Sequence, residues 1–391
     1  MNHPLWAGDD VAGATTPRRY LVMPSGNDPR LVIPTRPRRA SSRILHALRD
    51  RSTLKARART AGMEAAAFVN ARSQTLPSPG IFDVVATAIG RTLDEVVIGV
   101  HLGPPRANRK PVLAVADLDG TLLAFVKCGV DPLTDALVEH EAWALQELAA
   151  ASASGQLAHC TVPELLGSGR HAGHAYAIQT PVPTSASTLS AHRASSMAVV
   201  HAQVDVSRVR PPTDGGDPAD AIGQRWHDRS TSSADVVVGQ FADVATTWVE
   251  RVRGGTLSWG SWHGDWRTTN MSVTKDGCSV WDWERFSSGV PIGFDALHLF
   301  LTTRLPSVKT LATLPQDVFE NAPRLLRPFG VTDRSAVELT VVGYFLELGG
   351  RYLDDDQASA GARLGKVGEW LLPTLVEFVH SRTSTRGGTE Q

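Results

Sequence analysis

The most informative part of the chain is W-H-G-D-W-R-T-T-N at residues 262–270, followed by V-W-D-W-E at residues 280–284. Both runs set polar side chains among tryptophans. Burying a carboxylate in such apolar sequence is costly unless it binds a metal ion or hydrogen-bond partners. Asp265, Asn270, Asp282 and Glu284 all offer oxygen atoms. Oxygen ligands suit Mg²⁺ rather than zinc, so the two runs indicate a magnesium site.

This pair of runs resembles the catalytic segment of the aminoglycoside phosphotransferase and choline kinase-like family, a branch of the protein kinase-like fold. That segment reads H-G-D, four residues and N, with D-x-D or D-x-E one strand later, and every position is present here. The resemblance implies that Asp265 accepts or orients the proton of an acceptor hydroxyl. It also implies that Asn270 and Asp282 hold Mg²⁺ against nucleotide phosphates. These implied roles agree with the chemistry, because phosphoryl transfer needs mainly positioning and charge neutralisation.

Two residues of these runs keep two interpretations each. Arg267 either reaches the transferred phosphate or an anionic acceptor, or forms a surface ion pair. Glu284 either contacts the metal site or forms an outward salt bridge. His263 is expected to hold the loop by hydrogen bonds, and Asp295 resembles a family aspartate that braces the same loop.

The resemblance extends upstream. An apolar strand over residues 122–127 ends in Lys127, and a helical pattern over 132–148 contains Glu141. By resemblance, Lys127 contacts the α- and β-phosphates of the nucleotide and Glu141 orients it, with Glu139 and Glu147 as alternatives. Gln179 and Thr180 follow the strand that leads to the hinge, and their backbone is expected to contact the adenine.

The rest of the pattern predicts an α+β chain. Strands are expected over 96–101, 111–116, 121–126 and 176–178, and helices over 234–253, 294–303, 333–352 and 361–381. The polar segment 207–233 is expected to be a long loop or a partly ordered insertion. We therefore predict a two-lobed protein kinase-like fold. Its parts are a basic N-terminal extension (1–80), a small antiparallel-sheet lobe (81–180), a larger helical lobe (181–381) and a flexible tail (382–391).

The N-terminal extension lies outside the resemblance. Residues 1–80 carry 13 basic and 5 acidic side chains, which indicates a solvated arm, a packing cap or an anion-facing surface. Short strands are expected over 20–23 and 31–34, with a helix starting near Ser41 and another over 55–70. Further along, the loop over 103–110 lies where a nucleotide-covering loop belongs, and its basic residues Arg106, Arg109 and Lys110 are expected to be exposed.

Composition limits the function classes. The 391 residues carry a net charge of −1, so a globally basic nucleic-acid binder is not indicated. The 3 cysteines form no C-x-x-C pair, which argues against a disulfide framework or a zinc site and favours a reducing, cytoplasmic compartment. No apolar run approaches the ~18–20 residues of a membrane span. The expected partners are a nucleotide and a small-molecule acceptor.

Two alternatives to the kinase prediction remain open. The run V-A-D-L-D-G-T at 115–121 resembles the first motif of haloacid dehalogenase-like phosphohydrolases, with Asp117 as nucleophile and Asp119 as general acid. A hairpin explains the same residues, because Asp-Gly between two apolar runs is a turn signal. The other alternative is a catalytically silent kinase-like binding or scaffold protein. The main prediction is transfer of the γ-phosphate of ATP, or GTP, to a small-molecule hydroxyl, with Mg²⁺ and with Asp265 as catalytic base.

Overall fold

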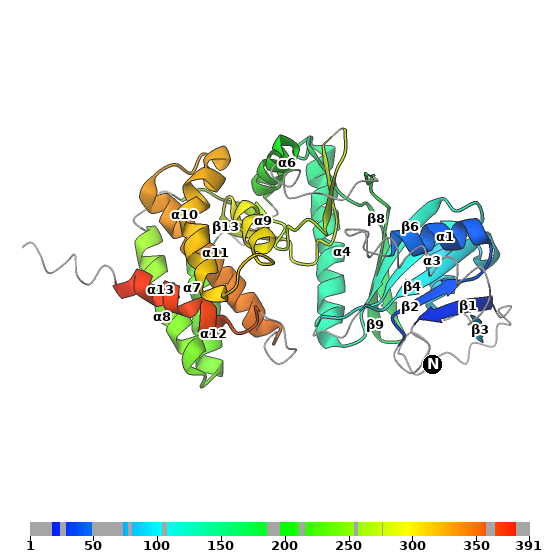
Figure 1. Ribbon diagram of the computed structural model, residues 1–391, viewed down its shortest axis with the longest axis horizontal. Helices are drawn as coiled ribbons and strands as arrows, with labels where there is room; N and C mark the ends of the chain where they lie inside the picture. The colour runs from blue at the N-terminus through cyan, green and yellow to red at the C-terminus, as the bar shows by residue number, and fades with distance from the viewer. Residues whose placement is uncertain are drawn as a thin grey trace, which may run out of the picture. The chain divides into compact units, whose positions relative to one another are not determined.

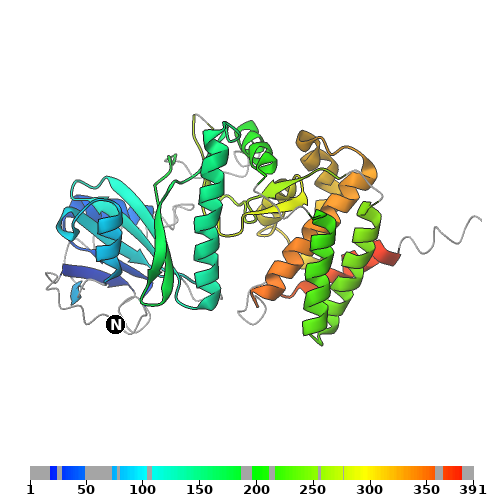
Figure 2. The same ribbon diagram turned by 180° about the vertical axis from the view of Figure 1, so that it is seen from behind.

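The computed structural model describes residues 18–23, 29–48, 73–76, 80–103, 108–185, 196–210, 216–253, 257–275, 277–356 and 364–380. The chain forms two compact units, drawn in Figure 1 and from behind in Figure 2. The first comprises Met1–Ala149, Val162–Leu189 and Val280–Glu284, and the second comprises Ala150–Thr161, Ser190–Ser279 and Arg285–Gln391. Each unit is built from three separate stretches of the chain. The predicted boundaries near residues 80 and 180 stay predictions. The predicted tail 382–391 lies outside the described residues.

The first unit is built on an eight-stranded antiparallel sheet with the order β3-β1-β2-β4-β5-β6-β9-β8. Its strands are β1 (Arg18–Met23), β2 (Leu31–Pro34), β3 (Ser73–Leu76), β4 (Val96–His101), β5 (Val112–Asp117), β6 (Leu122–Cys128), β8 (Leu165–His171) and β9 (His174–Gln179). The strands expected from the sequence are therefore confirmed, including the N-terminal pair. The sequence did not predict β8, whose two glycines weaken its strand pattern.

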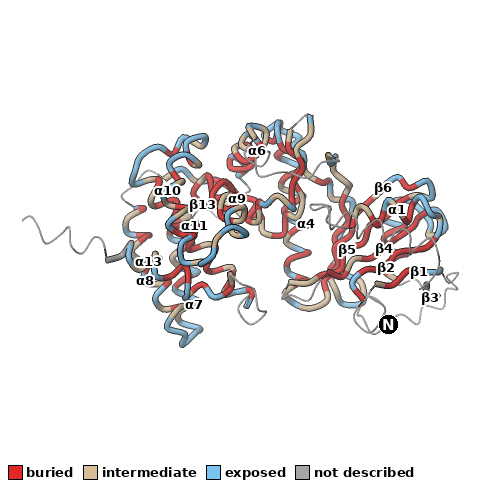
Figure 3. Tube along the Cα trace, viewed as in Figure 1, coloured by how far each residue is buried: buried red, intermediate tan, exposed pale blue. Residues whose placement is uncertain are grey.

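Helices cover both faces of this sheet (Figure 1). Strand residues alternate between faces, so Val96, Ile98 and Val100 pack with α3 (Ile81–Ala88), whereas Val97 packs with α1 (Arg38–Ala47). The short 3₁₀ turn η2 (Leu93–Glu95) leads from α3 into β4. Figure 3 shows the central strands β2, β4 and β5 as largely buried. Part of the N-terminal extension thus belongs to the sheet, while the helix expected over 55–70 lies outside the described residues.

The same alternation places Lys127. Ala124, Val126 and Cys128 of β6 belong to the cluster around α3, so Lys127 points to the opposite face. There α4 (Pro132–Ala153) packs Val138 and Ala142 against β9. The start of α4 is set locally, because the Asp131 carboxylate accepts a hydrogen bond from Thr134 N–H at 2.8 Å and Pro132 occupies the first turn.

The second unit is mainly helical and, among the described residues, carries the largest hydrophobic core. Its helices are α6 (Met197–Arg208), α7 (Pro218–Ser232), α8 (Val236–Arg253), α9 (Phe294–Arg304), α10 (Leu314–Leu326), α11 (Arg334–Asp354), α12 (Val367–Trp370) and α13 (Leu372–His380), with 3₁₀ turns η3 (Leu311–Thr313) and η4 (Arg327–Phe329). Two small sheets pair β10 (Trp259–Trp262) with β13 (Ser287–Pro291), and β11 (Met271–Val273) with β12 (Cys278–Val280) and β7 (Cys160–Thr161). The predicted α+β class with a sheet lobe and a larger helical lobe is confirmed.

One expected loop is a helix. In the described part of the segment 207–233, the chain ends α6 and then forms α7, so the long-loop alternative was wrong there. Asp217 caps α7 by accepting a hydrogen bond from Ala219 N–H at 2.8 Å, and Pro218 follows at the first helical position. Only a narrow stripe is apolar, with Ile222 and Trp226 buried four residues apart. The helix predicted over 361–381 is instead two shorter helices.

The aspartates of the run at 115–121 lie in a hairpin. Asp117 ends β5, its carboxylate accepts a hydrogen bond from Thr121 N–H at 2.8 Å, and Gly120 has a positive φ of 91° in the turn. Because β5 and β6 are antiparallel neighbours, the strand-to-helix crossover of a haloacid dehalogenase-like domain does not begin here. The hairpin interpretation is confirmed, and the phosphohydrolase alternative loses its structural basis.

Within the described ranges, every helix is too short or too polar to span a lipid bilayer.

Candidate functional site

A buried group of charges forms around Lys127 in the first unit. The Nζ atom of Lys127 lies 2.7 Å from Oε1 and 2.6 Å from Oε2 of Glu141, and it also forms an ion pair with Asp282. The side chains of Lys127 and Glu141 are only 8% and 0% exposed. The structure thus brings together three residues that the sequence singled out at distant positions.

Asp282 adopts an unusual backbone conformation in this group. Its φ of 73° lies in the left-handed region, which costs a non-glycine residue about 1 kcal/mol or more and is concentrated at functional sites. The next residue is held in place, since Trp283 N–H donates a hydrogen bond to Glu141 Oε1 at 3.1 Å. Residues 282–284 are therefore fixed against α4 at the expense of local strain.

Glu284 completes the group with a second lysine. It forms a buried salt bridge with Lys110, with side chains 7% and 5% exposed. The outward salt bridge considered for Glu284 and the exposed position expected for Lys110 were both wrong, because each side chain turns inward to the other. Arg109 is also partly buried, and its Nε donates to Leu102 O at 2.7 Å. Arg106 lies outside the described residues.

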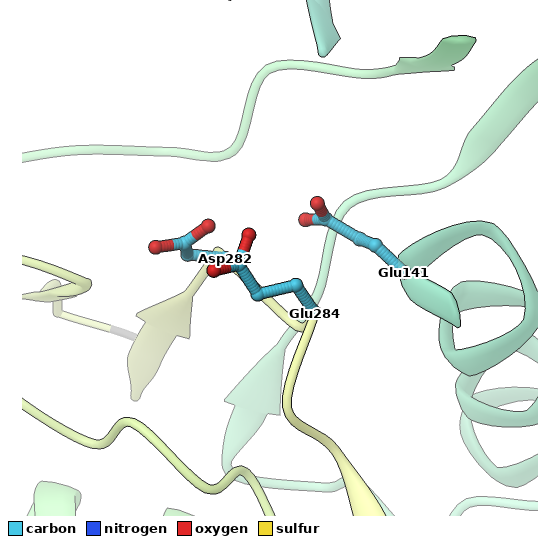
Figure 4. A group of neighbouring side chains, drawn as sticks. All are labelled: Glu141, Asp282 and Glu284. Carbon is cyan, nitrogen blue, oxygen red and sulfur yellow. The ribbon is translucent and has the colours of Figure 1, made fainter. Parts of the chain in front are cut away.

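The carboxylates of this group fit a divalent cation. Glu141, Asp282 and Glu284 each place one carboxylate oxygen within 4.8 Å of the others, and Figure 4 shows the three side chains directed toward a common region. Hard oxygen donors are the ligands that Mg²⁺ prefers. We call Lys110, Lys127, Glu141, Asp282 and Glu284 the lysine–carboxylate cluster.

The cluster also keeps its central lysine charged. Burial lowers the pKa of Lys127, but the carboxylates of Asp282, Glu141 and Glu284 raise it overall above its usual value. For Glu141, burial raises the pKa, and the charge of Lys127 only partly offsets that rise. Lys127 is therefore a permanent cation at neutral pH, which suits contact with phosphate.

In the second unit, the loop of residues 263–270, here called the Asp265 loop, is held by its backbone. The Asp295 carboxylate accepts hydrogen bonds from His263 N–H at 2.8 Å and Gly264 N–H at 3.3 Å. Arg351 of α11 donates to Gly264 O. Gly264 has a φ of 83°, and a Cβ there would lie 2.3 Å from Arg285 O, so only glycine fits. Asp295 braces this loop as expected.

Three side chains converge on Asp265. Arg267 Nε donates to Asp265 Oδ1 at 2.7 Å, and Asn270 Nδ2 donates to Oδ2 at 3.1 Å. His298 Nε2 lies 3.2 Å from Oδ1. Burial raises the pKa of Asp265, but the His298 hydrogen bond and the Arg267 charge lower it well below its usual range. Asp265 is therefore an anion at neutral pH.

His298 links Asp265 to α11. Its Nδ1 lies 3.0 Å from the hydroxyl of Tyr344. Burial lowers the pKa of His298 to about 4, so the ring is neutral, and burial raises the pKa of Tyr344 well above its usual value. A neutral ring has one donor and one acceptor nitrogen. The consistent assignment is that Tyr344 O–H donates to Nδ1, and Nε2–H donates to Asp265.

Asn270 keeps its amide oxygen available. Both bonds from Nδ2 go to Asp265, to its backbone oxygen and its carboxylate, each at 3.1 Å. Its Oδ1 accepts one hydrogen bond, from Thr269 Oγ1 at 3.3 Å. An amide oxygen has two lone pairs, so one remains for another partner.

The hinge residues lie at the end of β9. Thr180 N–H donates to Glu164 O at 2.9 Å and Thr180 Oγ1 accepts from Glu164 N–H at 2.8 Å, so this backbone donor is already used. Gln179 is 6% exposed, and its Oε1 has no hydrogen-bond partner among the described residues. An unpaired buried amide oxygen is costly, and a donor from a ligand would satisfy it.

The structure places the predicted residues in two groups, with Lys127, Glu141, Asp282, Glu284, Gln179 and Thr180 in the first unit and Asp265, Arg267 and Asn270 in the second. Sequence reasoning missed Lys110, His298, Tyr344 and Arg351. Lys110 and His298 contact the predicted residues Glu284 and Asp265, Tyr344 contacts His298, and Arg351 contacts the backbone of the Asp265 loop. The one available signal was His298 itself, a histidine in the apolar helix that begins beside Asp295.

No protein-family model matches the chain, and no curated protein matches it. Among solved structures, the chain is similar to a Streptomyces rimosus aminoglycoside phosphotransferase in complex with ADP and streptomycin, at 16% identity and a TM-score of 0.41 over 60% of this chain and 90% of that one. It is similar to a putative fructosamine-3-kinase from Haemophilus somnus (14%, TM-score 0.45, 74% and 96%). It is also similar to a choline/ethanolamine kinase family protein from Mesorhizobium loti (16%, TM-score 0.44, 68% and 85%).

Proposed function

We propose that this protein is an ATP-dependent phosphotransferase that moves the γ-phosphate to a hydroxyl of a small molecule. The lysine–carboxylate cluster carries the proposal. It combines a buried, permanently charged lysine with carboxylate oxygens close enough to share one cation, and it includes the aspartate held in a strained conformation. Phosphoryl transfer requires two features of this kind, a positively charged group that binds the phosphates and ligands for a metal ion.

In this proposal the cluster binds the phosphates of the nucleotide. Lys127 contacts the α- and β-phosphates, and Glu141 holds Lys127 in the required rotamer. Asp282 and Glu284, with the amide oxygen of Asn270, would hold Mg²⁺. The ion neutralises charge on the β- and γ-phosphates when it is bound. Gln179 contacts the adenine, and its buried side-chain oxygen suits the exocyclic amine; the Thr180 contact is through its carbonyl.

Asp265 acts on the acceptor. As an anion it accepts a hydrogen bond from the acceptor hydroxyl and aims its oxygen at the γ-phosphorus. As the new oxygen–phosphorus bond forms, the bond to the β,γ-bridging oxygen breaks, ADP leaves with that electron pair, and the hydroxyl proton passes to Asp265. Its lowered pKa makes it a weak base, so orientation is its larger contribution.

Arg267 is the cation nearest to Asp265. Its side chain is 46% exposed while it pairs with the Asp265 carboxylate. We propose that it interacts with the transferred phosphate or with an anionic group of the acceptor, for which a planar five-donor group is well suited.

The test is an assay of ADP release from Mg-ATP with a panel of acceptors that includes aminoglycosides, amino alcohols and ketosamine sugars. We expect at least one class to stimulate ADP release in the wild type. Stimulation should vanish in Asp265→Asn and in Asp282→Asn, whereas Asp243→Asn, on the exposed face of α8, should behave as the wild type. Mg-ATP binding with no stimulated release by any acceptor would favour the silent binding protein instead.

A further inference from the structure

Lys110 is the member of the cluster without a role in the proposed reaction. Its ammonium group is buried together with Glu284, at 5% and 7% side-chain exposure. A buried ion pair is weak evidence for a stabilising role, because an apolar pair of similar size often serves stability as well. The position of Glu284 points to a different reason for keeping the lysine.

The carboxylate that Lys110 holds is one that a cation would need. Glu284 places an oxygen within 4.8 Å of oxygens of Asp282 and Glu141. A divalent cation bound by these three carboxylates would therefore compete with Lys110 for Glu284. The five charges of the cluster, +2 from the lysines and −3 from the carboxylates, sum to −1. A divalent cation would change that sum to +1, a sign that attracts phosphate.

The backbone on both sides of Lys110 is held by hydrogen bonds. Moving the ammonium group away from Glu284 therefore requires movement of the Lys110 side chain only. Arg109 Nε holds Leu102 O at 2.7 Å on one side of Lys110. On the other side, Pro111 O accepts a hydrogen bond from Cys128 N–H at 3.0 Å, and Val112 pairs with Lys127 across the β5–β6 ladder. Lys110 lies two residues before the start of β5, and Lys127 lies opposite the first residue of β5. The two lysines are therefore at the same end of the β5–β6 pair.

We propose that Lys110 is a second phosphate-binding lysine, which neutralises Glu284 in the nucleotide-free protein and moves to the nucleotide phosphates when a divalent cation takes Glu284. This inference rests on the proposed function. It makes cation and nucleotide binding depend on Lys110 in opposite directions. Without the lysine, the cation meets no competitor for Glu284, but the phosphates lose one charged donor.

The test compares wild type with Lys110→Met in two titrations. In the first, Mn²⁺ alone is added and free Mn²⁺ is followed by electron paramagnetic resonance; we expect Lys110→Met to bind several-fold more tightly. In the second, a non-hydrolysable ATP analogue is added with saturating Mg²⁺, and we expect binding about tenfold weaker. Adenosine, which has no phosphates, should bind both proteins equally.

Matched variants keep the result interpretable. Lys366→Met removes an exposed lysine and should change neither titration. Lys110→Gln keeps a polar side chain and replaces Lys110→Met if that variant does not fold, with the same two opposite shifts expected. Glu284→Gln should weaken Mn²⁺ binding.

Three outcomes overturn the proposal. Binding of both Mn²⁺ and the analogue within twofold of the wild type would show that Lys110 touches neither ligand. Weakening of both would show a structural lysine. Folded wild-type protein that binds neither ligand would overturn the proposed function together with this inference, whereas normal wild-type binding with unchanged Lys110→Met binding overturns the inference alone.

Discussion

The lysine–carboxylate cluster and the Asp265 loop both bury carboxylates, but they compensate the charge in different ways. In the cluster, each carboxylate faces an ammonium group. At the loop, Asp295 of α9 accepts hydrogen bonds from backbone N–H groups, and Asp265 is held by a neutral histidine, an amide and one arginine. Ion pairs can exchange one partner for a metal ion or a phosphate. A carboxylate bonded to backbone groups cannot move without deforming the loop. We infer that the cluster responds to ligands and that the loop fixes geometry.

The largest effect is expected from Asp265→Asn. The substitution keeps the shape of the side chain but removes the anion that orients the acceptor hydroxyl, so phosphotransfer should fall by about 100- to 10,000-fold. Binding of an ATP analogue, assigned to the cluster, should stay within about twofold. Steady-state kinetics and calorimetry measure the two quantities. Equal loss of both would break the division between the two regions.

Asp265 and Asp295, the aspartate of α9 that braces its loop, should respond to pH with opposite signs. Burial raises the pKa of Asp295 to about 7, so its contribution to stability is present below its unfolded pKa of about 4 and is lost as the pH rises through 7. Asp265 has a lowered pKa, so its contribution is present above about pH 4 and is lost as the pH falls further. In Asp295→Asn the side chain cannot ionise, so this variant does not lose that contribution as the pH rises. Between pH 4 and 8 the unfolding free energy of the variant should therefore gain about 4 kcal/mol relative to that of the wild type.

Urea unfolding at a series of pH values checks this prediction. The matched control is Asp94→Asn, an exposed aspartate of the first unit that should follow the wild-type pH curve. Parallel curves for Asp295→Asn and the wild type would mean that the Asp295 carboxylate titrates normally.

In the cluster, Glu141→Gln should lower the unfolding free energy by about 3 kcal/mol, because it leaves Lys127 buried with less compensating charge. The double variant Glu141→Gln with Lys127→Met should recover part of that loss. Glu139→Gln is the control, since this side chain on the same helix is 51% exposed and pairs with Arg170 at the surface. Its expected cost is below about 1 kcal/mol. Equal costs for the two glutamates would contradict the buried ion pair.

The smallest effect compares two glycines with positive φ. Gly264 (φ 83°) has Arg285 O at 2.3 Å from a Cβ position, whereas Gly90 (φ 69°) has open space around it. Alanine should cost about 1–2 kcal/mol in strain at both positions. At Gly264 we expect about 2 kcal/mol more, since the loop must also shift. Thermal unfolding of the two variants measures the difference, and similar values would mean that the Asp265 loop is not rigid.

Sequence reasoning found the parts of the site that local pattern encodes. The sequence pattern predicted the strand that ends in Lys127 and the helix that contains Glu141, and the motif resemblance singled out these two residues. The tryptophan-rich runs marked Asp265 and Asp282. Sequence reasoning did not recognise the helix α7, because most of its residues are polar and only a narrow stripe is apolar. It also failed where a contact joins distant segments. Lys110 lies 174 residues before Glu284, and His298 lies 33 residues after Asp265. Only the assembled fold brings such pairs together.

Calorimetric titration of the full-length protein with a non-hydrolysable ATP analogue, with and without Mg²⁺, tests the central claim most directly. Asp282→Asn is the informative variant, because asparagine also tolerates the left-handed backbone of Asp282. The account predicts Mg²⁺-dependent binding in the wild type that is at least tenfold weaker in Asp282→Asn. Binding that ignores both Mg²⁺ and the substitution, or no binding by folded protein, would contradict it.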